Sequence, residues 1–397
     1  MTIPHEVRSY PFEMSERLML DPLYSELRAT ESVCRVSLPF GEDGWLVTRF
    51  EYARVVLADP RFSRAASVDR DEPRLGRHQH NVGITTMDPP HHTRLRGLAA
   101  KALTARRVEE LRLKTRETAQ RLVEDLVRHD PPVDLVEHFA LPFPIAVICE
   151  LMGVPPEDRG RLRSWAEVIL STTGASPEEV GRQRLAMHDY LTELVARRRR
   201  EPTDDLLGAM VLARDGEDRL TDDEMVLLAG AILTAGHETI ATQIPNFVYV
   251  LLTTPRLIDR VRAAPDLLES TVEELMRSVP LTTVLAARYA LEDVRLGDVV
   301  IRAGDPVVVS LASANMDEEV FCGASEIDPG RKHNPHLGFG HGSHHCIGAQ
   351  LARMELQVAL ETLLRRLPGL RLGVEEDALE WKSGMLVRGL RSLPVGW

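Results

Sequence analysis

The sequence predicts a mainly α fold with small β-sheets, and three observations lead to this prediction. Apolar residues recur at helical spacing from about residue 94 to residue 275, and again over 349–367. Alternating apolar and polar residues, typical of strands, are confined to the short segments 33–50 and 299–311. No Ser/Gly-rich linker or internal repeat divides the 397 residues, so a single domain over residues 1–397 is as admissible as the two or three domains that this length suggests.

Several of these elements have recognisable boundaries. Segment 33–50 turns at Gly41-Glu42-Asp43-Gly44, which predicts a hairpin. Asp88-Pro89-Pro90 is a stop before a helix that begins near His91. In Thr221-Asp222-Asp223-Glu224, a threonine cap and a glutamate three residues later form a capping box. This box opens a predicted helix that is long enough to reach about residue 252.

Composition excludes several classes of protein. The 48 basic and 60 acidic residues give a net charge of −12, and a net negative charge does not indicate nucleic-acid binding. The N-terminal residues lack an apolar signal core, and no run of 18 apolar residues predicts a membrane span. The four cysteines show neither disulfide nor paired-ligand spacing, as expected in a reducing compartment. We therefore expect a soluble, cytoplasmic protein that binds neither nucleic acid nor membrane.

The segment 339–348, Phe-Gly-His-Gly-Ser-His-His-Cys-Ile-Gly, places one cysteine between glycine-rich backbone and a predicted helix. Gly340 and Gly342 have no Cβ, so the loop can fold tightly around the sulfur. Cys346 lies just before the helix N-terminus, where the dipole and free N–H groups favour a thiolate. A stabilised thiolate suits a soft metal, and haem iron accepts one axial thiolate.

Two other interpretations of this segment are open. Cys346 could be an inert buried cysteine in a glycine-rich turn. It could also form a zinc cluster with His341, His344 and His345. Zinc sites usually combine such a pair of ligands with a second, distant pair. None of the other three cysteines has a histidine or a second cysteine within four residues, which weighs against zinc.

At this segment the chain resembles the cytochrome P-450 family, whose haem loop reads Phe-Gly-x-Gly-x-His-x-Cys-x-Gly. Every fixed position of the pattern is met, by Phe339, Gly340, Gly342, His344, Cys346 and Gly348. The resemblance implies the cytochrome P-450 fold, with haem b between the long central helix and the Cys-loop helix. It makes Cys346 the axial iron ligand. The chain is most similar to soluble bacterial members that tailor macrolides and other natural products in actinobacteria.

Inside the long predicted helix lies Ala235-Gly236-His237-Glu238-Thr239, which resembles the family's oxygen-activation motif. Gly236 weakens a helix by about 1 kcal/mol relative to alanine, so we expect it to allow close approach of the haem face. The Thr239 hydroxyl can bond a carbonyl one turn earlier. The resemblance assigns oxygen activation to Thr239 and proton delivery to Glu238. The alternative is a polar interruption of a core helix.

Glu274 and Arg277 place opposite charges three residues apart on one helix face. Taken alone, they are best interpreted as a solvated surface pair. The resemblance instead implies a buried structural triad completed by Arg331, since a guanidinium suits bidentate carboxylate binding. Cys322-Gly323-Ala324 replaces the family's usual Pro-Asp-Pro, which puts the conformation of the loop before Arg331 in doubt.

The resemblance also implies partners for the two haem propionates and for the substrate. It assigns binding of the propionates to His92, Arg96, Arg288 and His344. For each of these residues taken singly, a role on the surface is an equal alternative. The predicted substrate pocket consists of residues that are mostly small or apolar: Ala231, Thr234, Ala235, Val284, Leu285, Ala286, Met385 and Leu386. Such a lining predicts a roomy apolar cavity and a bulky lipophilic small-molecule substrate, first a macrolide or polyketide.

The resemblance therefore implies a monooxygenase that hydroxylates or epoxidises this substrate in antibiotic biosynthesis. It would use O2 and electrons from NAD(P)H through a ferredoxin reductase and a ferredoxin. Two alternatives stay open at this point. The same haem site could catalyse oxidative ring closure or coupling of a peptide or aromatic natural product. The chain could also be a non-catalytic haem or small-molecule binding protein, although such a protein has no use for a proton relay at 235–239.

Overall fold

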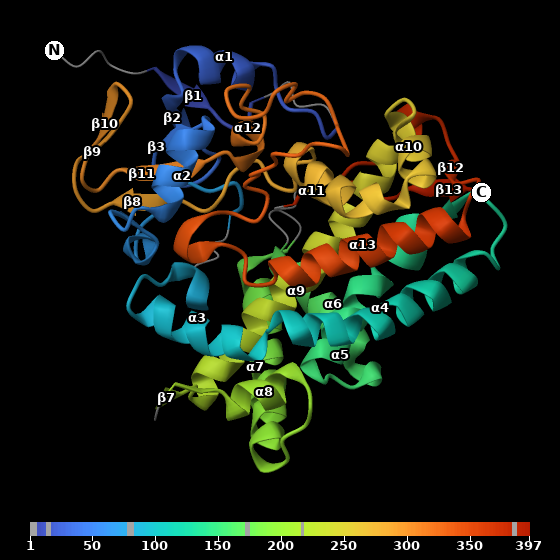
Figure 1. Cartoon of the computed structure of the whole chain (residues 1–397). Coiled ribbons are helices and arrows are strands. Elements are labelled where there is room, and N and C mark those ends of the chain that lie inside the picture. The colour runs from blue at the N-terminus through green and yellow to red at the C-terminus, as the bar shows by residue number, and fades with distance from the viewer. Residues whose placement is uncertain (1–5, 13–16, 78–82, 171–174, 216–217, 383–386) are drawn as a thin grey trace. The chain divides into compact units, whose positions relative to one another are not determined.

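The computed structural model describes residues 6–12, 17–77, 83–170, 175–215, 218–382 and 387–397. Figure 1 draws the chain coloured by residue number. The described residues fall into two compact units, each built from two segments of the chain. Unit 1 comprises residues 1–88 and 273–346, and unit 2 comprises residues 89–272 and 347–397. A single domain over residues 1–397 stays a prediction.

Unit 1 is built on a mixed sheet of six strands in the order β1-β2-β3-β11-β8-β4. Strands β2 and β3 pair antiparallel with Cys34 opposite Leu46, which confirms the hairpin predicted over 33–50. Strand β11 runs parallel to β3, so the second half of the strand-like segment 299–311 joins this hairpin, while its first half pairs with β9. The strands are β1 (Val7–Ser9), β2 (Val33–Ser37), β3 (Gly44–Val47), β4 (Phe62–Ser63), β8 (Arg288–Ala290) and β11 (Pro306–Val309), with β9 (Val294–Leu296) and β10 (Val299–Ile301) as a separate antiparallel pair.

The core of unit 1 lies where helix α2 (Phe50–Ala58) packs against this sheet. Phe50 of the helix and Phe321 meet edge to face, with ring centroids 5.7 Å apart. Val47 and Val307 contribute to the same buried cluster from adjacent strands. Burying a side chain of this size stabilises the fold by about 1.5–3 kcal/mol. The short helices α1 (Leu23–Thr30) and α12 (Leu311–Ala314) complete the unit.

Unit 2 is mainly helical, as the apolar periodicity predicts. Its first helix begins at His91, the predicted position. Its helices are α3 (His91–Ala102), α4 (Ala105–Leu126), α5 (Pro142–Met152), α6 (Arg159–Leu170), α7 (Pro177–Arg200), α8 (Leu206–Leu212), α9 (Asp222–Thr253), α10 (Leu257–Ala263) and α13 (Ala349–Arg366), while α11 (Leu268–Ser278) crosses the boundary between the units. Its small sheets are β12-β13-β5, with β5 (Val133–Asp134), β12 (Arg371–Leu372) and β13 (Pro394–Gly396), and β6-β7, with β6 (Arg214–Asp215) and β7 (Asp218–Arg219).

Helix α9 is the 32-residue core helix of unit 2. Its capping box forms as predicted: Thr221 Oγ1 accepts from the Glu224 N–H at 3.2 Å, and Glu224 Oε2 accepts from the Thr221 N–H at 2.9 Å. The helix continues through Pro245 and ends at Thr253. It is long and apolar enough to cross a membrane. Most of its residues are nevertheless buried, and it packs against α5, α7 and α13, as the core helix of a soluble protein does.

Candidate active site

Cys346 ends a tight loop of unit 1, three residues before α13 begins. The Cys346 N–H donates to the Phe339 carbonyl at 2.8 Å and closes the loop. Gly340 and Gly342 have φ angles of 75° and 71°, a conformation that side-chain-bearing residues rarely adopt. A Cβ at position 342 would also collide with the backbone carbonyl of Leu57. The cysteine side chain is exposed, so the loop presents its sulfur for binding.

The other cysteines differ from Cys346 in position and reactivity. Cys34 and Cys149 are buried, and burial raises the pKa of each thiol to about 12. They are therefore inert thiols at neutral pH. Cys322 is exposed like Cys346. Within the described part of the chain, no three His, Cys, Asp or Glu side chains come together as a metal site, so the geometry gives no support to a zinc cluster.

Arg288, on strand β8, is a buried cation in the same unit as Cys346. It is 6% exposed, and burial together with the nearby Arg64 lowers the pKa of Arg288 to about 10. Arg64 has its own counter-ion, Glu72, at 3.1 Å. No acceptor among the residues that the structure describes binds the Arg288 guanidinium. An unpaired buried charge is costly, and a propionate would neutralise it. The exposed sulfur of Cys346 and the buried guanidinium of Arg288, both in unit 1, thus fit the iron and a propionate of a haem.

On helix α9, a stripe of accessible residues interrupts an otherwise buried surface. Ala235 is exposed, and Ala231, Thr234 and Thr239 are half-buried. The Thr239 hydroxyl donates to the Ala235 carbonyl at 2.8 Å, the bond to the preceding turn that the sequence predicts. The small side chains leave space along this face of the helix.

Gly236 packs closely against Ile148 of α5. Close approach of a haem face at this glycine stays a prediction. A Cβ on residue 236 would lie 3.0 Å from Ile148 Cδ1, tighter than an ordinary contact. Close packing of α5 on α9 is therefore sufficient to explain the glycine.

Glu238 is buried and paired with a lysine that sequence reasoning missed. Lys382 Nζ lies 2.7 Å from Glu238 Oε1 and 2.9 Å from Thr242 Oγ1. Lysine and glutamate are 144 residues apart, and no local pattern around Lys382 signals the contact.

Glu274, Arg277 and Arg331 meet in the interior of unit 1. Arg277 binds both carboxylate oxygens of Glu274, at 2.7 and 2.9 Å, and both side chains are 0% exposed. Arg331 Nε lies 3.0 Å from Glu274 Oε2. The alternative of a solvated surface pair is therefore wrong.

Residues 322–324, where the sequence departs from the family pattern, bind the arginines of this cluster through their backbone carbonyls. The carbonyls of Cys322 and Gly323 accept hydrogen bonds from Arg331 at 2.8 and 3.2 Å. The carbonyl of Ala324 accepts from Arg277 at 2.8 Å. Because backbone oxygens make these contacts, the unusual side chains leave the cluster complete.

Comparison with known proteins places this geometry in a family. A cytochrome P450 family model matches residues 178–388. Mycinamicin IV hydroxylase/epoxidase from Micromonospora griseorubida is 50% identical over 393 residues, which cover 99% of each chain. The chain belongs to the cytochrome P450 family.

Solved structures of P450s agree in fold. The mixed-function P450 MycG superposes with a TM-score of 0.95 at 50% identity, covering 99% of this chain and 100% of that one. Cytochrome P450mel 107F1, described with biaryl coupling reactivity, has a TM-score of 0.94 at 41% identity, with coverage of 99% and 100%. The predicted mainly α P450 fold, the haem cofactor with cysteine thiolate ligation and the monooxygenase class are thereby confirmed.

The other predicted residues of this P450 are distributed over both units. His92 is buried and Arg96 half-buried, one turn apart on α3 in unit 2, and Gly348 is the N-cap of α13 in the same unit. Arg288 and His344 belong to unit 1. It stays a prediction that the haem propionates are bound jointly by His92, Arg96, Arg288 and His344.

The predicted pocket segment 284–286 lies in unit 1. Val284 and Leu285 are half-buried and pack against the core clusters of unit 1, while Ala286 is exposed, so a role of the three in binding a ligand stays a prediction. The Leu285 N–H donates to the Val309 carbonyl at 3.1 Å, which ties the segment to the end of β11. Met385 and Leu386 lie outside the described residues.

Glu355, on α13, is a second residue that sequence reasoning missed. It is 1% exposed, and neither carboxyl oxygen has a hydrogen-bond partner among the described residues. Burial raises its pKa well above the ordinary 4.5, because the charged form is poorly solvated. The protonated form of this carboxyl group is therefore favoured more in the folded chain than in the unfolded one.

Replacing Glu355 with glutamine should therefore change how stability depends on pH. As the pH rises above about 4.5, the unfolded wild-type chain ionises at this residue more readily than the folded chain, so stability falls by up to about 1.4 kcal/mol per pH unit until the raised folded pKa is reached. The variant lacks this loss and should become progressively more stable than wild type towards neutral pH. Urea unfolding across this range measures the difference. Parallel stability curves for the two proteins would contradict the inference.

Proposed function

We propose that this P450 hydroxylates or epoxidises a bulky lipophilic secondary metabolite of the macrolide or polyketide class in antibiotic biosynthesis. The accessible stripe of small residues on α9, next to Thr239, is the observation that carries the proposal. The identity of 50% to a macrolide hydroxylase/epoxidase supports the substrate class. We further propose that electrons come from NAD(P)H through a ferredoxin reductase and a ferredoxin, and that the enzyme is cytoplasmic.

In this proposal, each side chain of the site has a separate role in binding the haem or in catalysis. The haem, when bound to Cys346, supplies the activation of O2. The thiolate of Cys346 would hold the iron and would supply electron density to it. Thr239, anchored on Ala235, presents its hydroxyl at the accessible face of α9 and orients oxygen. Glu238, the adjacent carboxylate, delivers protons, a role in which the position of the group matters first. Arg288 holds a propionate.

Replacing Thr239 with alanine should uncouple electron consumption from product formation. Without the hydroxyl the oxygen site loses its local hydrogen-bonding group, and we expect product per NADPH to fall by about 10²-fold, the lower end for general acid–base contributions. Simultaneous measurement of product, peroxide and NADPH checks this. Thr239→Ser, which keeps the hydroxyl, is the matched control and should stay well coupled. Equal coupling in Thr239→Ala and wild type would show that Thr239 has no such role.

The reaction class is tested with labelled dioxygen. A macrolide substrate is first found by the shift of the Soret band on binding, and turnover is then run under ¹⁸O2. Hydroxylation or epoxidation places one labelled atom in the product. Oxidative coupling, the second candidate, is favoured by the likeness to the biaryl-coupling P450 and leaves no label. An unlabelled, cyclised or coupled product would replace our proposal with this second candidate.

A further inference from the structure

The carboxylate of Glu238 is held in a small closed network on α9. Lys382 Nζ donates to Glu238 Oε1 at 2.7 Å and to Thr242 Oγ1 at 2.9 Å. The Thr242 hydroxyl in turn donates to Glu238 Oε1 at 3.4 Å. The side chains of Glu238 and Lys382 are only 6% and 14% exposed, so solvent screens this ion pair weakly.

The position of Lys382 is fixed by a hairpin formed by residues 380–382 and 387–391, which we call the C-terminal hairpin. The Lys382 N–H donates to the Gly389 carbonyl at 2.8 Å across the hairpin. Asn246 Nδ2, two turns beyond Glu238 on α9, donates to the Arg388 carbonyl at 2.9 Å. The hairpin is thus fastened to α9 through its backbone, and Lys382 extends from it to Glu238.

The network engages only one oxygen of the carboxylate. Both hydrogen bonds reach Glu238 Oε1. No described residue donates to Oε2, which leaves that oxygen to take up a proton and release it. Fixing one oxygen also fixes the direction of the other, and direction decides whether a carboxylic acid can transfer its proton.

We propose that Lys382 is a positioning residue for oxygen chemistry in this P450. Its ammonium group holds Oε1 of Glu238, so that Oε2 accepts a proton from solvent and passes it to the oxygen site beside Thr239. The carboxylate alternates between –COO⁻ and –COOH: solvent supplies the proton, the oxygen site receives it, and Lys382 and Thr242 keep their charge throughout. The inference rests on the proposed role of Glu238 in proton delivery, and it adds the residue of the C-terminal hairpin that controls this role.

The test compares Lys382→Met, Glu238→Gln and the double variant with wild type. Lys382→Met should lower product per NADPH by about tenfold, as is common when the partner that orients a functional group is removed. It should also change the solvent isotope effect on O2 consumption, because proton delivery becomes slower. If Lys382 acts through Glu238, the double variant should be no worse than Glu238→Gln alone. Lys382→Arg keeps the charge and should retain most of the coupling.

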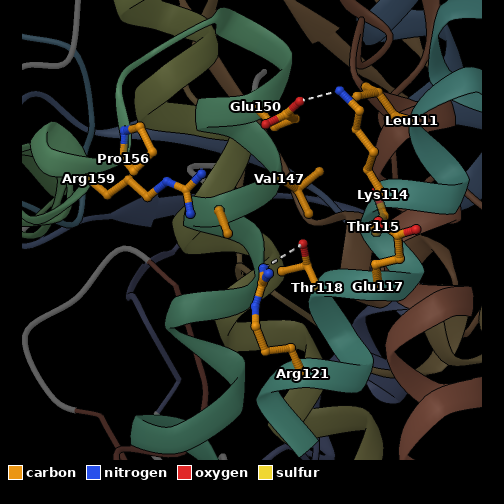
Figure 2. A pocket seen from close by; sticks show the side chains of 11 residues that line it. Leu111, Lys114, Thr115, Glu117, Thr118, Arg121, Val147, Glu150, Pro156 and Arg159 are labelled. Atoms are coloured by element: carbon orange, nitrogen blue, oxygen red, sulfur yellow. Dashed lines mark hydrogen bonds and ion pairs between the residues drawn. The ribbon is translucent and has the colours of Figure 1, made fainter.

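Lys114→Met is the matched control for loss of a lysine ion pair in unit 2. Lys114 on α4 pairs with Glu150 on α5 at 2.5 Å, and both side chains are exposed (Figure 2). This variant should behave like wild type in coupling and isotope effect.

Three results would overturn the proposal: wild-type behaviour of Lys382→Met, losses that multiply in the double variant, or equal impairment of Lys382→Arg and Lys382→Met. If Lys382→Met fails to fold, the double variant is compared with Glu238→Gln instead. The double variant lacks both charges of the pair, so it leaves no buried charge without its partner, and this comparison decides whether Lys382 acts through Glu238. The reduced carbon monoxide spectrum and the Soret shift on substrate binding should stay unchanged in every variant. Failure of the proposed function is a separate result, because it appears as unlabelled product from the wild-type enzyme.

Discussion

Replacing Cys346 with serine should reduce product formation below detection. Serine keeps the size of the side chain, and the loop that closes through the Phe339 carbonyl can still form. A serine hydroxyl is not a thiolate at neutral pH, so it cannot supply the electron donation that the iron requires. Turnover with surrogate redox partners, together with the reduced carbon monoxide spectrum, measures the loss.

Cys322→Ser is the control for this substitution, since Cys322 is the other cysteine described as exposed. Only its backbone carbonyl is used, by Arg331, and the substitution leaves that carbonyl in place. This variant should match wild type in activity and spectrum. Activity that survives in Cys346→Ser, or disappears equally in both variants, would remove the assignment of Cys346.

Replacing Glu274 with alanine should have the largest effect on stability. The substitution leaves Arg277, which is 0% exposed, without its carboxylate, and Arg331 loses the same partner. Breaking a buried ion pair by removing one partner costs about 3–5 kcal/mol, a large part of the stability of a typical protein. Urea unfolding of the haem-loaded protein, followed by circular dichroism, measures the loss.

Glu319→Ala provides the comparison, because Glu319 pairs with Arg49 at 2.8 Å while its own side chain is 66% exposed. A surface pair of this kind contributes about 0–1 kcal/mol. We therefore expect Glu274→Ala to lower the free energy of unfolding much more than Glu319→Ala does. Similar losses in the two variants would mean that the buried cluster is dispensable.

Features encoded within about ten residues could be predicted from the sequence. The capping box of α9 depends on Thr221 and Glu224, and the Cys346 loop depends on glycines whose positive φ angles the structure confirms. In both cases neighbouring residues determine the geometry, so no knowledge of the rest of the fold is needed.

Features that depend on distant residues could not be predicted. Lys382 reaches Glu238 only because the C-terminal hairpin is fastened to α9. The burial of Glu355 depends on the helices that surround α13. The close packing of Ile148 against Gly236 likewise depends on how α5 meets α9.

Binding of haem iron by the Cys346 thiolate is tested most directly by the reduced carbon monoxide difference spectrum of the purified wild-type protein. We expect the strongly red-shifted Soret band that thiolate ligation produces. A band typical of imidazole ligation, or protein that stays colourless when haem is supplied, would contradict the account.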